Sequence, residues 1–177
     1  TIWLVQPDIV HKSISSLSCK EYEGKFRLLN DLEVICWEGN HSFFVAFCTI
    51  PGMLIYLSGD LGSGKTSFAR GLIHELGFVG AVKSPSYSLV EQYIFDCYTL
   101  NHFDLYRFKS AEEWYEAGFN EFINEENINL IEWPEKGHPY LPISDLIINL
   151  NYVDSRKRKA LITANSLKGM ECIKELM

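Results

Sequence analysis

Apolar and polar positions follow regular patterns from about residue 51 onward. Residues 53–58 form a short apolar run that is typical of a buried strand. Residues 66–76 place four apolar side chains at helical spacing, and Gly77 follows as a helix stop. The first well-defined unit is therefore a strand, a glycine-rich turn and a helix.

The same patterns predict further strands and helices. The strands are expected at 89–95, 98–103, 127–131, 146–150 and 160–164, and the helices at 110–117 and 166–177. Strands that alternate with helices favour an α/β fold with a mainly parallel sheet flanked by helices. Because only a polar turn separates the last two strands, we expect those late strands to be antiparallel.

The first part of the chain gives a weaker pattern. No period is sustained over residues 1–30, and one helix is possible within residues 28–48. We expect residues 1–50 to form an irregular segment packed on a core built by residues 51–177, so that the chain is a single globular domain overall. Pro51 and Gly52 divide the apolar stretch 43–57 into halves too short to cross a bilayer, and no signal peptide is evident, so no membrane association is expected.

Charge and cysteine content limit the classes of function. The chain has 16 basic and 23 acidic residues, which gives a net charge of −7. This balance disfavours binding of nucleic acid by bulk electrostatics, so any such role should be local or pass through a partner. Five cysteines occur without a C-x-x-C pair, which favours a reducing compartment, the cytoplasm, over a disulfide framework or a zinc site.

The turn after the first strand carries a complete phosphate-binding motif. Residues 59–66 read GDLGSGKT and fit the pattern G-x-x-x-x-G-K-[ST]. The glycines let backbone N–H groups surround phosphate oxygens, the lysine brings a positive charge to the β- and γ-phosphates, and the threonine offers a hydroxyl to Mg²⁺. A chance match in a glycine turn is the alternative, but the flanking strand and helix create an anion site at a helix N-terminus. The expected nucleotide-binding residues of this unit are Gly59, Gly62, Ser63, Gly64, Lys65, Thr66 and Ser67.

Two carboxylates follow predicted strands and extend the candidate site. Asp104 ends the strand 98–103, and Glu132 ends the strand 127–131. In open α/β sheets, ligands bind beyond the carboxyl ends of the strands, so both acids are expected near Thr66. One acid can help to hold Mg²⁺ and the other can orient the attacking water, which makes both candidates for catalytic and metal-binding roles. Position alone leaves open that either acid is a capping or surface carboxylate.

Four motifs in register resemble the TsaE (YjeE) family, whose members are P-loop ATPases of tRNA threonylcarbamoyladenosine biosynthesis. They are GDLGSGKT at 59–66, VKSPSYSLVE at 82–91, HFDLYR at 102–107 and IEWPE at 131–135. The match spans roughly residues 51–164 and departs mildly from the family pattern, with Ser63 in place of alanine and Ser86 and Ser88 in place of threonine. Residues 1–50 match poorly.

The resemblance implies a fold, an activity and partners. It implies a P-loop NTPase-like fold and a Mg²⁺-dependent ATPase that hydrolyses ATP slowly to ADP. It further implies action with TsaB-like and TsaD-like proteins, which make threonylcarbamoyladenosine at position 37 of tRNAs that read ANN codons. Contact with tRNA would then be indirect, through the complex. A small-molecule P-loop kinase and a non-catalytic ATP-gated scaffold remain as alternatives.

The resemblance also implies roles for individual residues. Asp104 and Glu132 match functional acids of the family, and Trp133 matches a residue at the nucleotide base. We expect the flat face of Trp133 to stack on adenine, and a core or rim aromatic is the alternative. An arginine just before the last strand should reach the nucleotide; Arg158 fits best and Arg156 remains an alternative. Residues 84–87 are either a switch segment that senses the γ-phosphate or an ordinary loop before a strand. His102 is expected to be a packed or hydrogen-bonded strand residue and not a metal ligand.

Overall fold

The computed structural model describes residues 19–22, 25–28, 51–153 and 158–174. Within these residues, a six-stranded sheet has the order β4-β5-β6-β3-β7-β8. Its strands are β3 (Leu54–Ser58), β4 (Val90–Ile94), β5 (Thr99–Asp104), β6 (Asn127–Glu132), β7 (Leu146–Tyr152) and β8 (Arg158–Ala164). The helices are α3 (Lys65–Glu75), α4 (Glu113–Glu116) and α5 (Leu167–Lys174), with two short 3₁₀ helices, η1 (Phe119–Phe122) and η2 (Pro134–Lys136).

The sheet is parallel in its middle and antiparallel at both edges. The strands β5, β6, β3 and β7 form three parallel pairs, whereas β4 pairs antiparallel with β5, and β8 pairs antiparallel with β7. This confirms the predicted α/β fold with a mainly parallel sheet and late antiparallel strands. The antiparallel β4–β5 pair was not predicted, but the connection at 95–98 is too short for the crossover that a parallel pair requires.

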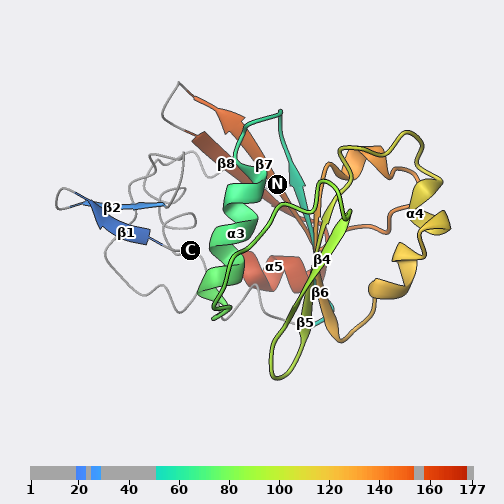
Figure 1. The fold of residues 1–177 in the computed structure, drawn as a ribbon, viewed down its shortest axis with the longest axis horizontal. Coiled ribbons are helices and arrows are strands. Elements are labelled where there is room, and N and C mark those ends of the chain that lie inside the picture. The colour runs from blue at the N-terminus through green and yellow to red at the C-terminus, as the bar shows by residue number, and fades with distance from the viewer. Residues whose placement is uncertain (1–18, 23–24, 29–50, 154–157, 175–177) are drawn as a thin grey trace.

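Helices cover the two faces of the sheet and define two apolar clusters. On one face, α3 and α5 pack against alternate residues of the central strands, such as Ile55, Leu130 and Ile148. On the other face, α4 and η1 pack around Phe103 and Ile131. In Figure 1, α4 lies across the sheet from α3 and α5. Because successive strand residues point to opposite faces, the residues that share a face with Leu130 are those directed toward α3.

A row of hydrogen-bonded side-chain amides runs across β4, β5 and β6, at one edge of the sheet. Gln92 of β4 donates to Asn101 of β5 at 2.9 Å, and Asn101 donates to Asn129 of β6 at 2.9 Å. The three residues are direct cross-strand partners, and both asparagines are buried. We call this row the amide ladder. It satisfies polar groups that would otherwise be costly to bury.

The remaining elements differ from the sequence predictions in detail. Within 1–30, where no regular structure was predicted, β1 (Cys19–Tyr22) and β2 (Lys25–Leu28) pair antiparallel. The helix predicted at 110–117 is only the single-turn α4, because the helix begins later than predicted, at Glu113; its end, before the left-handed Gly118, agrees closely with the prediction. Of the possible helix at 28–48, Leu28 ends β2 and the rest lies outside the described residues. Of the turn predicted at 154–159, residues 154–157 lie outside the described residues, whereas Arg158 and Lys159 belong to β8.

The C-terminal helix begins where a serine caps it. Ser166 accepts a hydrogen bond at its Oγ from the backbone N–H of Gly169 at 3.0 Å, and α5 then runs to Lys174. Over the described part of the chain, no helix is both long enough and apolar enough to cross a bilayer.

Candidate functional site

The glycine-rich loop joins β3 to α3 and depends on glycine at close backbone approaches. Gly59 has a φ of 139°, and a Cβ there would lie 2.2 Å from the carbonyl oxygen of Leu150. Gly62 has a φ of 77°, and a Cβ there would lie 2.6 Å from the hydroxyl of Tyr152. At Gly59 both the backbone conformation and the Leu150 carbonyl therefore require glycine. At Gly62 the backbone conformation requires it, and the Tyr152 hydroxyl of β7 lies close by.

Lys65 is the first residue of α3 and is nearly enclosed. Its Nζ donates to the carbonyl oxygens of Gly59 at 2.6 Å and Asp60 at 2.8 Å, and it lies 3.7 Å from the centre of a Trp133 ring. Burial lowers the pKa of Lys65, and nearby carboxylates, Glu132 above all, oppose that effect. Backbone carbonyl oxygens of the glycine-rich loop therefore hold the Lys65 ammonium against the loop.

Glu132 ends β6 and connects three elements. Its Oε2 accepts a hydrogen bond from the Thr66 hydroxyl at 3.0 Å, and its Oε1 lies 2.8 Å from Nε2 of His102 on β5. The carboxylate is 2% exposed, so both of its oxygens have a protein partner in a buried setting. A surface or simple capping carboxylate would not be enclosed in this way.

Asp104 ends β5 and is held by a loop. Its Oδ2 accepts hydrogen bonds from the hydroxyls of Ser86 at 2.6 Å and Ser84 at 3.4 Å, and its Oδ1 accepts from the backbone N–H of Tyr106 at 3.0 Å. Asp104 is also the direct register partner of Glu132 in the parallel β5–β6 pair. The two acids therefore stand side by side at the carboxyl end of the sheet.

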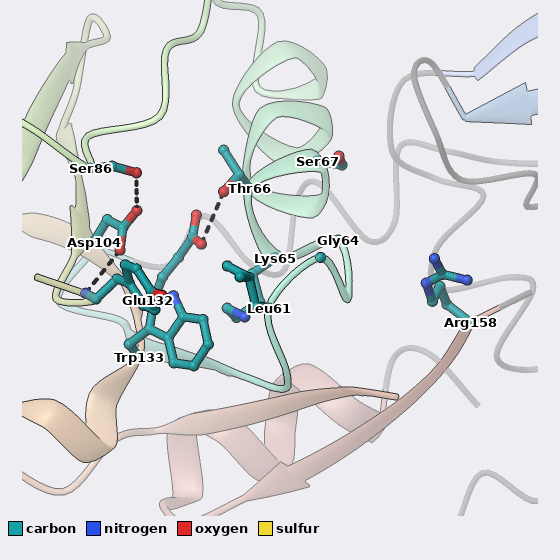
Figure 2. A pocket seen from close by; sticks show the side chains of 12 residues that line it. Leu61, Gly64, Lys65, Thr66, Ser67, Ser86, Asp104, Glu132, Trp133 and Arg158 are labelled. Atoms are coloured by element: carbon teal, nitrogen blue, oxygen red, sulfur yellow. Dashed lines mark hydrogen bonds between the residues drawn. The ribbon is translucent and has the colours of Figure 1, made fainter. Parts of the chain in front are cut away.

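A cleft of about 280 Å³ opens above these groups. It is lined by Leu61, Gly62, Gly64, Lys65, Thr66, Ser67, Ser86, Asp104, Tyr106, Glu132, Trp133 and Arg158. Figure 2 shows the two acids and Trp133 on one side of the loop, with Thr66 directed toward Glu132. Of the residues predicted from the sequence, Gly59 and Ser63 do not line the cleft; Gly59 instead packs on β7, and Ser63 is buried.

Trp133 and Arg158 lie at different parts of the rim. Trp133 has a left-handed backbone with a φ of 59°, and its ring contacts Lys65 and also Tyr106, at a ring-centre distance of 5.0 Å. Arg158 begins β8 and lies 4.0 Å over the ring of Tyr152, across the loop from the acids (Figure 2). Contact of either side chain with a nucleotide stays a prediction, and Arg156 lies outside the described residues.

Sequence reasoning missed several contacts of the site. Tyr152, which was not singled out, donates from its hydroxyl to the carbonyl of Leu61 within the glycine-rich loop at 2.9 Å. His102 was expected to be a hydrogen-bonded strand residue, and the structure identifies its partner as Glu132. The spacing of His102 in the sequence could have indicated its place in the site. His102 stands two residues before Asp104, so the two side chains lie on the same face of the sheet.

Comparison with known proteins now adds to this geometry. A model of the family described as threonylcarbamoyl adenosine biosynthesis protein TsaE matches residues 40–160. The chain belongs to the TsaE family. The resemblance inferred from the four motifs is thereby confirmed.

Individual TsaE relatives extend over most of the chain. A protein named tRNA threonylcarbamoyladenosine biosynthesis protein TsaE from Haemophilus influenzae is 42% identical over 119 residues, which cover 67% of this chain and 75% of that protein. A protein of the same name from Bacillus subtilis is 32% identical over 114 residues, covering 64% and 71%. The crystal structure of Bacillus subtilis YdiB superposes with a TM-score of 0.59 at 26% identity and covers 76% of this chain and 83% of that chain.

Proposed function

We propose that this TsaE-family protein binds ATP with Mg²⁺ and hydrolyses it slowly in the cytoplasm. The energy would drive turnover of a TsaB–TsaD machinery that makes threonylcarbamoyladenosine at position 37 of tRNAs that read ANN codons. The names of the relatives support the pathway. The observation that carries the activity is the position of Lys65 and Thr66 beside Glu132, with Asp104 adjacent on the next strand.

The donor set at the cleft fits Mg²⁺. Thr66 supplies a hydroxyl oxygen, and Glu132 and Asp104 supply carboxylate oxygens, which are the hard ligands that Mg²⁺ prefers. Within the described residues, no group of three or more His, Cys, Asp or Glu side chains could hold a metal by itself. That is the expected arrangement for a nucleotide-bound ion, because Mg²⁺ in such sites takes only one or two carboxylates and the substrate phosphates supply other ligands. Bound Mg²⁺ would neutralise charge on the phosphates.

The chain's own groups have separable tasks in this proposal. Backbone N–H groups of the loop and the Lys65 ammonium bind the phosphates and stabilise the charge that spreads over the transferred group. Glu132, which already contacts Thr66, lies on the metal side of the site. Asp104 is then left to orient the attacking water, and its Oδ2 accepts hydrogen bonds from Ser84 and Ser86 of the loop 84–88. That loop is then the segment placed to respond to a γ-phosphate.

The test is ATP hydrolysis by the protein alone and with a purified TsaB–TsaD pair. We expect slow turnover alone and stimulation by the pair, with both lost in Lys65→Ala. Lys168→Ala is the matched control, because Lys168 contacts the carbonyl of Gly52 at 3.2 Å, before the start of β3 and away from the cleft. Nucleotide binding without hydrolysis under either condition would contradict the ATPase and favour the scaffold. ADP release that requires an added metabolite would favour the kinase.

A further inference from the structure

His102 is a buried polar residue that the proposed reaction has not yet used. It is fully buried on β5 and does not line the cleft, so it does not reach a ligand directly. Its Nε2 lies 2.8 Å from Oε1 of Glu132. Because a carboxylate oxygen only accepts, Nε2 carries the hydrogen and donates. Within the described residues, Nδ1 has no hydrogen-bond partner, so the hydrogen bonding of the ring is directed to Glu132.

The two carboxylate oxygens of Glu132 contact different kinds of partner: Oε1 contacts His102 in the core, and Oε2 contacts Thr66 at the cleft. His102 stands directly opposite Leu130, two residues before Glu132, so the contact is a diagonal one within the parallel β5–β6 pair. The other oxygen accepts from Thr66, at the start of α3 and on the wall of the cleft. A ligand in the cleft can compete for the Thr66 hydroxyl, whereas the contact of His102 lies behind the carboxylate, in the core.

We infer that His102 is a positioning residue that fixes the Glu132 carboxylate so that Oε2 faces Thr66 and the cleft. This inference rests on the proposed function, because the orientation of the Glu132 carboxylate affects turnover only if the protein hydrolyses ATP. A histidine in this place has a cost that an apolar residue would avoid, since Nδ1 is buried without a partner. The contact with Glu132 is the feature that a leucine of similar size could not provide.

Loss of such a supporting hydrogen bond should lower turnover by about 10-fold to 100-fold. We expect this fall in kcat for His102→Leu, with the dissociation constant for ADP in EDTA unchanged within about 2-fold, because the phosphate-binding groups are untouched. His102→Gln retains an amide donor that can reach toward Glu132 and should recover part of the loss. His74→Leu is the matched control, because His74 lies near the end of α3, where its Nδ1 is 3.0 Å from the carbonyl of Phe78 and away from the cleft.

A double-mutant cycle with Glu132→Gln decides whether His102 acts through Glu132. We expect His102→Leu to cause little further loss of turnover when Glu132→Gln is already present. In urea unfolding without nucleotide, the cycle uses Glu132→Ala, which removes the hydrogen bond to His102, and the two substitutions should shift the midpoint by less together than the sum of their separate shifts. Full additivity in both cycles, or normal kcat in His102→Leu, would overturn the inference.

The two cycles also separate this inference from the proposed function. The unfolding cycle uses no nucleotide, so it reports the His102–Glu132 link whatever the protein does with ATP. Absence of ATP hydrolysis by the unsubstituted protein would contradict the proposed function. An unfolding cycle that is non-additive in that case would support the link as a structural one and overturn its role in turnover.

Discussion

The ends of β5 and β6 carry two acids in equivalent positions with different surroundings. Asp104 and Glu132 are register partners, and both are buried. Glu132 contacts a helix and a strand, through Thr66 and the fully buried His102. Asp104 contacts two serine hydroxyls, one of them on the exposed Ser84, and one backbone N–H in the turn that follows its strand.

This difference shows how one edge of a sheet can combine a rigid group with an adjustable one. Helices and strands of the core open rarely, whereas surface loops lie at the low-stability end of a protein. The contacts of Glu132 are therefore expected to persist when a nucleotide binds. The two serine contacts of Asp104 are expected to change, because they come from a surface loop, 84–88, in which Ser84 is exposed and Ser86 is half-buried.

The largest effect should come from neutralising the rigid acid. Glu132→Gln is expected to lower kcat for ATP hydrolysis by about 1,000-fold, as for loss of a main electrostatic group at a reaction centre. The fold should persist, because the amide can accept from His102 at Oε1 and donate to the Thr66 oxygen. Single-turnover hydrolysis measures this, with Glu126→Gln before the other end of β6 as the control. A fall of less than about 10-fold would mean that Glu132 is structural.

A smaller effect is expected at the adjustable acid. Asp104→Asn keeps the shape and can still accept from Ser86, so we expect kcat to fall by about 100-fold with ATP still bound. Steady-state kinetics and a nucleotide titration together check this, and Asp96→Asn in the β4–β5 connection is the matched control. If Asp104→Asn reduced turnover more than Glu132→Gln did, the division into a rigid and an adjustable acid would be wrong.

The smallest effect concerns the loop hydroxyl. Ser86→Ala removes the 2.6 Å hydrogen bond to Asp104 but leaves the charge. We expect kcat to fall about 5-fold and the free energy of unfolding to change by about 1 kcal/mol or less. Ser88→Ala is the control, because its hydroxyl contacts Glu91 on the surface and not Asp104. Equal turnover in the two variants would show that the loop does not act through Asp104.

Local sequence patterns predicted the parts of the site that lie close together in the chain. The spacing of glycine, lysine and threonine at 59–66 predicted the loop, and the apolar run 53–58 predicted the strand that precedes it. The positions of Asp104 and Glu132 at strand ends were also predicted, because strand-end acids in a parallel sheet must lie at one edge.

Contacts between distant segments could not be predicted in the same way. The pairing of Ser86 with Asp104, of His102 with Glu132, and of Tyr152 with the loop depends on strand order and register. Neither the strand order nor the register can be derived from a single sequence. The register matters because a shift of one residue along a strand would turn each side chain to the other face of the sheet. The end of the helix predicted at 110–117 was a local feature that the sequence predicted closely, with Gly118 as the signal, whereas its late start at Glu113 was not predicted.

The amide ladder has a consequence for how reliably the two acids come together. Asn101 and Asn129 each stand three residues before an acid, on the same two strands. If β5 paired with β6 one residue out of step, these amides would face opposite sides of the sheet and remain buried without each other. Such mispaired states are therefore disfavoured during folding by a contact outside the cleft. The uncharged residues Asn101 and Asn129 thus favour the register in which the carboxylates of Asp104 and Glu132 lie side by side.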